Sequence, residues 1–246
     1  MLVIKDAMAT LDLTFAPCPD GQLSLPDANG AHIWQIDLDV ARDAMLSASE
    51  QAQAKAMRHA EKQSHFVAAR SALRVILSKY VGGTPNNLPL ATAAQGKPFL
   101  DLAGAPQFNV THARGKALIA VAPMAIGIDL EFARHVRQLD RLVEQYFAPA
   151  EEKALTALPD DQRAQAFLAA WTRKEACLKA TGEGIAGGLH RYQVTLRADE
   201  DAQLLAIDGN ETAARAWTLH AFRAFGDGQA AVCAATPSLS LHGFAL

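Results

Sequence analysis

The sequence predicts an α+β fold in which a small, mainly antiparallel sheet and a long helix occur twice along the chain. Residues 62–80 carry an apolar stripe at helical spacing, which predicts the first long helix. Residues 160–180 are predicted as the second, because a cluster of glycines follows them. Strand-like segments precede and follow both helices, with the join near Pro123. No sequence repeat accompanies this order, so only the architecture is duplicated.

The first half of the chain begins with a weakly patterned, proline-containing segment. We expect residues 1–30 to form an N-terminal extension with one short strand near residues 11–15. A clear strand is predicted at residues 32–38, and Ser49 is a candidate N-cap for the Ala/Gln-rich helix that follows. Three further short strands are predicted in an antiparallel meander, at residues 88–94, 108–111 and 117–122.

The second half of the chain changes from strand to helix after residue 131. A helix is predicted at residues 139–146, and Pro149 followed by two glutamates is typical of the start of another. The longest helix, at residues 160–180, comes next. Closing strands are predicted at residues 191–196, 217–224 and 229–235.

The bulk composition excludes several classes of protein. A chain of 246 residues that is 50% hydrophobic can bury the core of one large domain or two small ones. A net charge of −3 argues against a dedicated nucleic-acid-binding protein. The three cysteines are too widely spaced for a disulfide framework or a zinc site, which favours the reducing cytoplasm. We find no signal peptide and no apolar stretch of membrane-spanning length, so no membrane partner is expected.

The chain's most informative short segment is the sequence GIDLE at residues 127–131. Apolar side chains alternate with Gly127, Asp129 and Glu131, so the two carboxylates share one face of a strand, with Cα atoms roughly 6.5–7 Å apart. We expect Gly127 to leave open space beside them. Neighbouring carboxylates repel unless a cation lies between them, and a hard divalent cation is the first hypothesis. The alternative is an edge strand that exposes its acids to water.

A second group of charged residues lies in the segment WTRKEACLK. Trp171, Glu175 and Lys179 are spaced by four and form one ridge of a helix. This ridge is either a solvated ion-pair face or the wall of a cleft. In the second case Glu175 supplies a third carboxylate to the strand acids. A carboxylate site ringed by cations suits a magnesium–pyrophosphate substrate, and the candidate cations are Lys179, Lys97, His112 and Arg70.

Five motifs, in order and at similar spacing, resemble those of the 4′-phosphopantetheinyl transferases of the two-lobed, monomeric Sfp type. The resemblance covers about residues 32–235, and the pair GIDLE plus WTRKEACLKATGEG is its most specific part. The motifs are GKP at Gly96–Pro98, FNVTH ending at His112, GIDLE ending at Glu131, FAPAE ending at Glu151, and WTRKEACLKATGEG from Trp171 to Gly184.

The resemblance implies two similar α+β lobes with pseudo-twofold symmetry, an N-terminal lobe at residues 31–124 and a C-terminal lobe with the metal site at residues 125–246. Coenzyme A, the co-substrate, would bind between them. Its 4′-phosphopantetheine arm would move to a serine of an apo acyl, peptidyl or aryl carrier protein, and adenosine 3′,5′-bisphosphate would leave. The implied cofactor is Mg²⁺, with Mn²⁺ as a substitute, and the implied state is a monomer.

The resemblance also assigns roles to individual residues. Asp129, Glu131 and Glu175 match the metal ligands, and Glu175 also matches the proposed general base. Lys179 and His112 match residues that contact the phosphates. The remaining coenzyme A contacts are expected from Lys97, Thr111, Arg58, Lys62 and Arg70.

Two other classes of function use the same residues. A magnesium-dependent hydrolase of nucleotide phosphates would release phosphopantetheine to water instead of transferring it to a protein. A catalytically silent module would bind coenzyme A or a carrier without turnover, although the full set of acids and Lys179 speaks against it.

Overall fold

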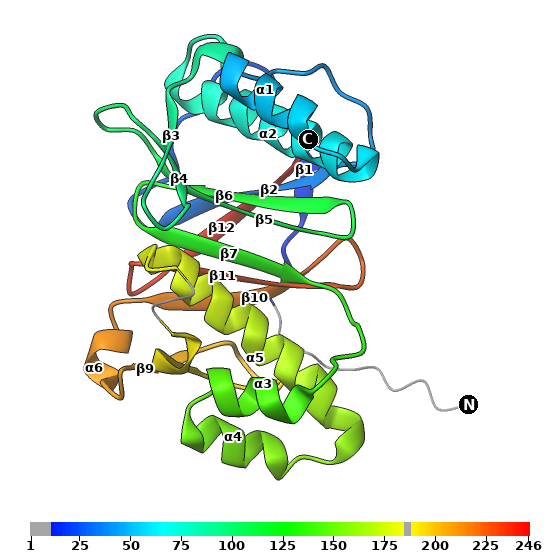
Figure 1. Cartoon of the computed structure of the whole chain (residues 1–246). Helices are drawn as coiled ribbons and strands as arrows, with labels where there is room; N and C mark the ends of the chain where they lie inside the picture. Colours follow the sequence, from blue (N-terminus) through cyan, green and yellow to red (C-terminus); the bar gives the residue numbers. More distant parts are fainter. Residues whose placement is uncertain (1–10, 185–187) are drawn as a thin grey trace.

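The computed structural model describes residues 11–184 and 188–246, which form four layers (Figure 1). Two β-sheets face each other in the middle of the molecule. Helix α2 (Ala60–Val81) packs on the outer face of the first sheet, and helix α5 (Asp160–Thr181) packs on the outer face of the second. This mixed architecture of helices and sheets agrees with the predicted α+β class.

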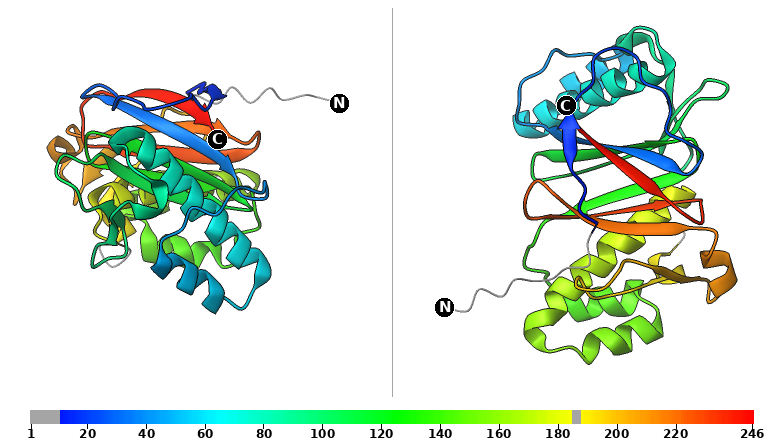
Figure 2. Two further views of the ribbon diagram at one scale, coloured as in Figure 1. Left: turned by 90° about the horizontal axis from the view of Figure 1, so that it is seen from above. Right: turned by 180° about the vertical axis from the view of Figure 1, so that it is seen from behind.

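The first sheet has five strands in the order β1-β12-β2-β6-β5. Strands β2, β6 and β5 pair antiparallel, whereas β12 runs parallel to both β1 and β2. Figure 2 shows β12 in red beside the blue strand β2, although the two come from opposite ends of the chain. The strands are β1 (Phe15–Pro17), β2 (Gly30–Asp37), β5 (Gln107–Ala113), β6 (Lys116–Ala122) and β12 (Ser240–Ala245).

The second sheet is antiparallel, in the order β10-β11-β7. Two small hairpins and several shorter helices complete the described chain. The strands are β7 (Ile126–Glu131), β10 (Thr218–Ala224), β11 (Gly228–Ala234), and the hairpins β3 (Leu90–Thr92) with β4 (Pro98–Leu100) and β8 (Tyr192–Val194) with β9 (Leu204–Ile207). The helices are α1 (Ala48–Ala56), α3 (Leu139–Tyr146), α4 (Pro149–Thr156), α6 (Glu211–Ala214), η1 (Pro85–Asn87) and η3 (Leu189–Arg191).

Three apolar clusters hold the layers together. The cluster between the sheets contains the apolar face of β7, including Ile126, Ile128 and Leu130. Because side chains alternate along a strand, the other face of β7 points toward α5. The predicted alternation therefore has a structural reason: the apolar face joins the sheets, and the acidic face meets the motif helix.

The two sheets also meet along the neighbouring strands β5 and β7, which side-chain bonds connect. The backbone N–H of Ile128 donates to Oδ1 of Asn109 at 2.9 Å. Thr111 Oγ1 donates to Oδ1 of Asp129 at 3.1 Å. The FNVTH and GIDLE motifs therefore lie side by side at the join between the sheets.

Gly127 lies against the backbone of helix α5. A Cβ built on this glycine would lie 2.1 Å from the carbonyl oxygen of Ala176 and 2.3 Å from the amide nitrogen of Ala180. The expectation that Gly127 leaves open space beside the acids is therefore wrong. The helix backbone fills that space, which brings α5 close to β7.

Several element predictions are confirmed and others need correction. The helix predicted at residues 139–146 has those bounds, and the two long helices extend the predictions by one or two residues. The N-cap of helix α1 is Ser47 instead of Ser49, because Ser47 and Glu50 form a reciprocal capping box. Strand β1 begins at Phe15, where the expected strand ends, and Leu11 forms only an isolated bridge.

Strand β12 is missing from the predicted elements. It pairs with β2, so the last strand of the chain belongs to the first sheet. Its Gly243 is a residue type that usually weakens a strand, but a Cβ there would lie 2.3 Å from the carbonyl oxygen of Thr14. Close packing against the segment before β1 therefore explains the glycine. Residues 240–245, expected in the C-terminal lobe, pair with β2 in the first sheet.

Within residues 11–184 and 188–246, no helix combines the length and apolar character needed to cross a membrane.

Candidate active site

The predicted strand acids and the helix ridge come together where β7 packs on α5. Asp129 is 5% exposed, and its Oδ1 accepts hydrogen bonds from Lys179 Nζ at 2.6 Å and from Thr111 Oγ1 at 3.1 Å. Its Oδ2 is buried without a hydrogen-bond partner among the described residues. A buried carboxylate oxygen with no donor is costly unless a cation or another donor reaches it.

Glu131 and Glu175 lie close enough to Asp129 for their charges to interact. Burial raises the pKa of Glu131, and the negative charge of Asp129 raises it further. Arg134 opposes this effect, since its Nη2 lies 3.4 Å from Oε1 of Glu131. Burial likewise raises the pKa of Glu175; Lys179 opposes that shift, whereas the two strand acids add to it.

These groups allow a test of the expected magnesium site. Across the described residues, no group of three or more His, Cys, Asp and Glu side chains is arranged to hold a metal ion as it stands. The chemistry of the donors nevertheless fits Mg²⁺. The charge of Asp129 raises the pKa of Glu131, and both strand acids raise the pKa of Glu175, so the three carboxylates lie close enough to share a cation. Oδ2 of Asp129 is buried and has no hydrogen-bond partner among the described residues. The assignment of Asp129, Glu131 and Glu175 as ligands stays a prediction.

A pocket of about 500 Å³ lies between α2 and the β5–β6 hairpin. Three of the residues predicted to contact coenzyme A line it: Lys62, Arg70 and His112. Basic side chains around an aromatic ring suit a polyanion that also carries a flat base. The remaining lining side chains that matter here are His65, Phe66, Pro98 and Arg114.

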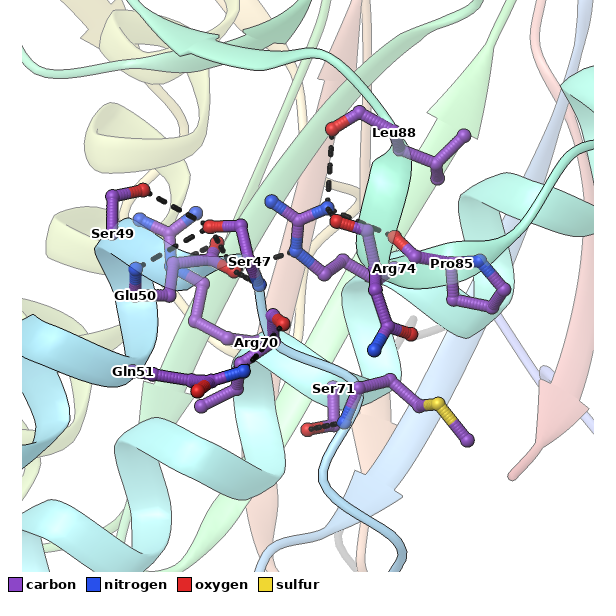
Figure 3. A network of polar contacts seen from close by, with 12 residues as sticks. Ser47, Ser49, Glu50, Gln51, Arg70, Ser71, Arg74, Pro85 and Leu88 are labelled. Carbon is purple, nitrogen blue, oxygen red and sulfur yellow. Dashed lines mark hydrogen bonds and ion pairs between the residues drawn. The ribbon is translucent and has the colours of Figure 1, made fainter.

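Arg70 belongs to a network that fixes α1 against α2 (Figure 3). Arg74, one turn further on, is buried; its Nε donates to Oε2 of Glu50 at 2.6 Å and its Nη1 donates to the carbonyl oxygens of Pro85 and Leu88. Arg74 and Glu50 therefore form a buried ion pair with a structural role. Arg70 Nε lies 4.0 Å from Oε1 of the same glutamate, so Glu50 holds Arg70 at the pocket wall.

Three other predicted contacts lie outside the pocket lining. Lys97 donates from Nζ to the carbonyl oxygens of Lys179 at 2.7 Å and Ile126 at 3.1 Å, which ties the end of α5 to the start of β7. Burial lowers the pKa of Lys97 to about 8. Thr111 is buried and orients Asp129. Arg58 is exposed between α1 and α2. Direct contact of these three with coenzyme A stays a prediction.

Sequence reasoning missed a buried ion pair beside the site. Lys174, next to Glu175, is fully buried, and its Nζ donates to Oε2 of Glu151 and to the carbonyl oxygen of Tyr192, both at 2.5 Å. Glu151 also accepts the backbone N–H groups of Ala148 and Val194. One feature of the sequence points to a role for Glu151. It is the third residue of a helix that starts with proline, and a glutamate at this position often closes a capping box.

Arg114 was also missed, although it directly follows the FNVTH motif. It lies in the turn between β5 and β6, with φ of 48°, and lines the pocket with His112. The sequence feature that could have identified Arg114 is its place before Gly115 in a two-residue turn, where asparagine or glycine is favoured.

Comparison with known proteins identifies the family of this chain. A model of the 4′-phosphopantetheinyl transferase superfamily matches residues 125–235, which include β7 and α5. The 4′-phosphopantetheinyl transferase HetI of Nostoc sp. is 37% identical over 204 residues, 79% of this chain and 85% of that protein. The 4′-phosphopantetheinyl transferase psf-1 of Bacillus pumilus is 29% identical over 71% of this chain and 75% of that protein. This chain belongs to the 4′-phosphopantetheinyl transferase superfamily.

Proposed function

We propose that this chain transfers the 4′-phosphopantetheine group of coenzyme A to a serine hydroxyl of a carrier protein. The observation that carries the proposal is the meeting of Asp129, Glu175 and Lys179 at the β7–α5 contact in a member of this superfamily. In the reaction the serine oxygen forms a bond to the β-phosphorus of coenzyme A. The bond from that phosphorus to the bridging oxygen breaks, and adenosine 3′,5′-bisphosphate leaves.

The pocket between α2 and the β5–β6 hairpin is the proposed site for the nucleotide and its phosphates. Lys62, Arg70 and His112 supply positive charge or hydrogen-bond donors along its wall. Lys179 extends this charge into the carboxylate cluster, where its ammonium already contacts Asp129. These cations would orient the pyrophosphate and stabilise charge on its oxygens as the bond breaks.

Glu175 is the proposed acceptor of the serine proton. Without a bound cation, burial and the neighbouring acids raise the pKa of Glu175, whereas a cation held by the same carboxylate would lower it, so the roles of base and metal ligand oppose each other at this residue. Glu175 lies on the half-buried ridge of α5, with Trp171 one turn before it and Lys179 one turn after it. A serine entering along that ridge would meet Glu175 beside the phosphate-binding cation.

Asp129, Glu131 and Glu175 are the proposed ligands of Mg²⁺, for which Mn²⁺ would substitute. When bound, this cation would supply positive charge that offsets the negative charge developing on the leaving phosphate. Thr111 and Lys97 act as positioning residues in this scheme. Thr111 orients Asp129, and Lys97 fixes the end of α5 against β7.

A pseudo-twofold relation between two lobes is a further part of the proposal. Each half contains a strand that pairs with the second strand of a hairpin: β2 with β6 of β5–β6, and β7 with β11 of β10–β11. A helix of 22 residues separates strand from hairpin in both halves. These matches support lobes at residues 31–124 and 125–246, with β12 returning to the first sheet.

The proposed physiological setting is a monomer in the cytoplasm. The described cysteines, Cys18, Cys177 and Cys233, are all free thiols, which suits a reducing compartment. Size-exclusion chromatography with light scattering would test the monomer.

The test of the reaction is incubation with coenzyme A, Mg²⁺ and a panel of apo acyl, peptidyl and aryl carrier proteins. Intact mass spectrometry should show a carrier that gains one phosphopantetheine group, and chromatography should show adenosine 3′,5′-bisphosphate in equal amount. A carrier whose serine is replaced by alanine should gain nothing. Release of free phosphopantetheine with no gain by any carrier would replace this proposal with a hydrolase.

A further inference from the structure

Arg114 occupies a backbone conformation that arginine rarely adopts. Strand β5 ends at Ala113 and β6 begins at Lys116, so Arg114 and Gly115 form a two-residue turn. Both have positive φ, 48° and 70°. A turn with this pair of left-handed residues favours Asn-Gly, and a side chain as large as arginine is strained there. Strained residues of this kind concentrate at functional sites.

The guanidinium of Arg114 is held in one orientation by the loop that follows β7. Its Nη2 donates to the carbonyl oxygen of Ala133 at 2.6 Å, and its Cζ lies 5.4 Å from the centre of the Phe132 ring. Phe132 itself is buried, so it forms a fixed surface under the planar group. The side chain therefore reaches from the first sheet to the loop after β7, and the hydrogen bond and the ring contact favour this orientation.

This orientation leaves donors of Arg114 available at the rim of the pocket. A guanidinium has five N–H donors, and the structure records one hydrogen bond from Arg114 to the described residues. Arg114 and His112 both line the pocket and are two residues apart. Lys62 and Arg70 line the opposite wall on α2. An anion in this pocket would thus meet cationic groups from two elements.

We propose that Arg114 binds a phosphate group of coenzyme A at the rim of this pocket. The proposal rests on the function proposed above and adds a substrate-binding residue to it. The contact with Ala133 and Phe132 pre-orients the guanidinium, so little rotamer freedom is lost when a phosphate binds. The coenzyme has phosphates in two places, the pyrophosphate and the 3′-phosphate of the ribose, and the experiment below distinguishes them.

The experiment measures coenzyme A binding to the full chain by calorimetry, with the unmodified protein and the variants Arg114→Asn and Arg114→Lys. Asparagine is favoured at this turn position, so Arg114→Asn should keep its melting temperature while it loses the guanidinium. We expect Arg114→Asn to raise the Kd for coenzyme A about tenfold or more. Arg114→Lys, which keeps the charge but not the planar fork, should fall between the two. Arg215→Asn, an exposed arginine at the end of α6, is the control and should bind normally.

Dephospho-coenzyme A, which lacks the 3′-phosphate, identifies the phosphate involved. An equal loss of affinity for both ligands places Arg114 at the pyrophosphate, and a loss seen only with coenzyme A places it at the 3′-phosphate. Affinity of Arg114→Asn for coenzyme A within about twofold of the unmodified protein would overturn the proposal. If the unmodified chain bound no coenzyme A at all, the proposed function itself would fail.

Discussion

Lys179 places its ammonium 2.6 Å from Oδ1 of Asp129, and this contact joins the motif helix to the motif strand. The aspartate is almost fully buried, whereas the lysine is about 29% exposed at its side chain. In this arrangement the lysine partly neutralises the acids and remains open to an anionic ligand. The same group therefore serves the folded protein and the proposed reaction.

Lys179→Met should lower kcat/KM for phosphopantetheine transfer about 10²- to 10³-fold, the usual effect of removing one group that stabilises charge in the transition state. Methionine keeps the length and packing of the side-chain stem, so circular dichroism should show a folded variant, but the melting temperature should fall because buried Asp129 loses its cation. Rates are therefore compared below that melting temperature. Lys153→Met, an exposed lysine of α4, is the control. A rate close to that of the unmodified protein would show that Lys179 contributes only to the ion pair.

The sequence predicts those parts of the candidate site in which the periodicity of one helix or strand determines which side chains share a face. Alternation in a strand is enough to place Asp129 and Glu131 on one face, and a spacing of four is enough to place Glu175 and Lys179 on one ridge. The structure brings these two faces into contact. Position within one element depends on backbone geometry alone, which explains why these predictions succeeded.

The remaining features depend on contacts between segments that are distant in sequence. The pairing of Glu151 with Lys174, the clamp from Lys97 to the end of α5, and the return of β12 to the first sheet have no local pattern. Gly127 illustrates the same limit. A glycine in a strand signals a close approach, but the sequence does not say whether open space or a helix backbone lies opposite it.

Gly127→Ala should strongly destabilise the protein, because its Cβ would overlap the carbonyl oxygen of Ala176. We expect a loss of about 3 kcal/mol or more in the free energy of unfolding, at the upper end for overpacking, since the neighbouring atoms are backbone. Urea unfolding followed by tryptophan fluorescence would measure it. Gly30→Ala is the comparison, because its nearest neighbour is a Cβ of Pro26 in a loop and its cost should be smaller. Equal and small losses for both would contradict the close contact.

The buried pair of Lys174 and Glu151 should act on stability, not on chemistry. Lys174→Met leaves Glu151 buried with no cationic partner and should cost about 3–5 kcal/mol in the free energy of unfolding. Adding Glu151→Gln should recover part of that loss, because an amide oxygen still accepts a backbone N–H but carries no charge. The double-mutant cycle is measured by urea unfolding. Strictly additive losses, or a stable Lys174→Met variant with no activity, would assign this lysine a different role.

His32 should make the free energy of unfolding depend on pH in weakly acidic solution. Burial, followed by the charge of His242, lowers the pKa of His32 from 6.5 to about 4, and its Nδ1 lies 2.8 Å from the hydroxyl of Tyr80. The unfolded chain therefore binds more protons between these values, so stability is fully present above about pH 6.5 and falls as the pH drops toward 4. Urea unfolding at several pH values should show a weaker decline for His32→Asn than for the unmodified protein, with His135→Asn, an exposed histidine, as the control. Equal slopes in all three proteins, or an NMR titration of the His32 ring near its ordinary pKa, would refute this assignment.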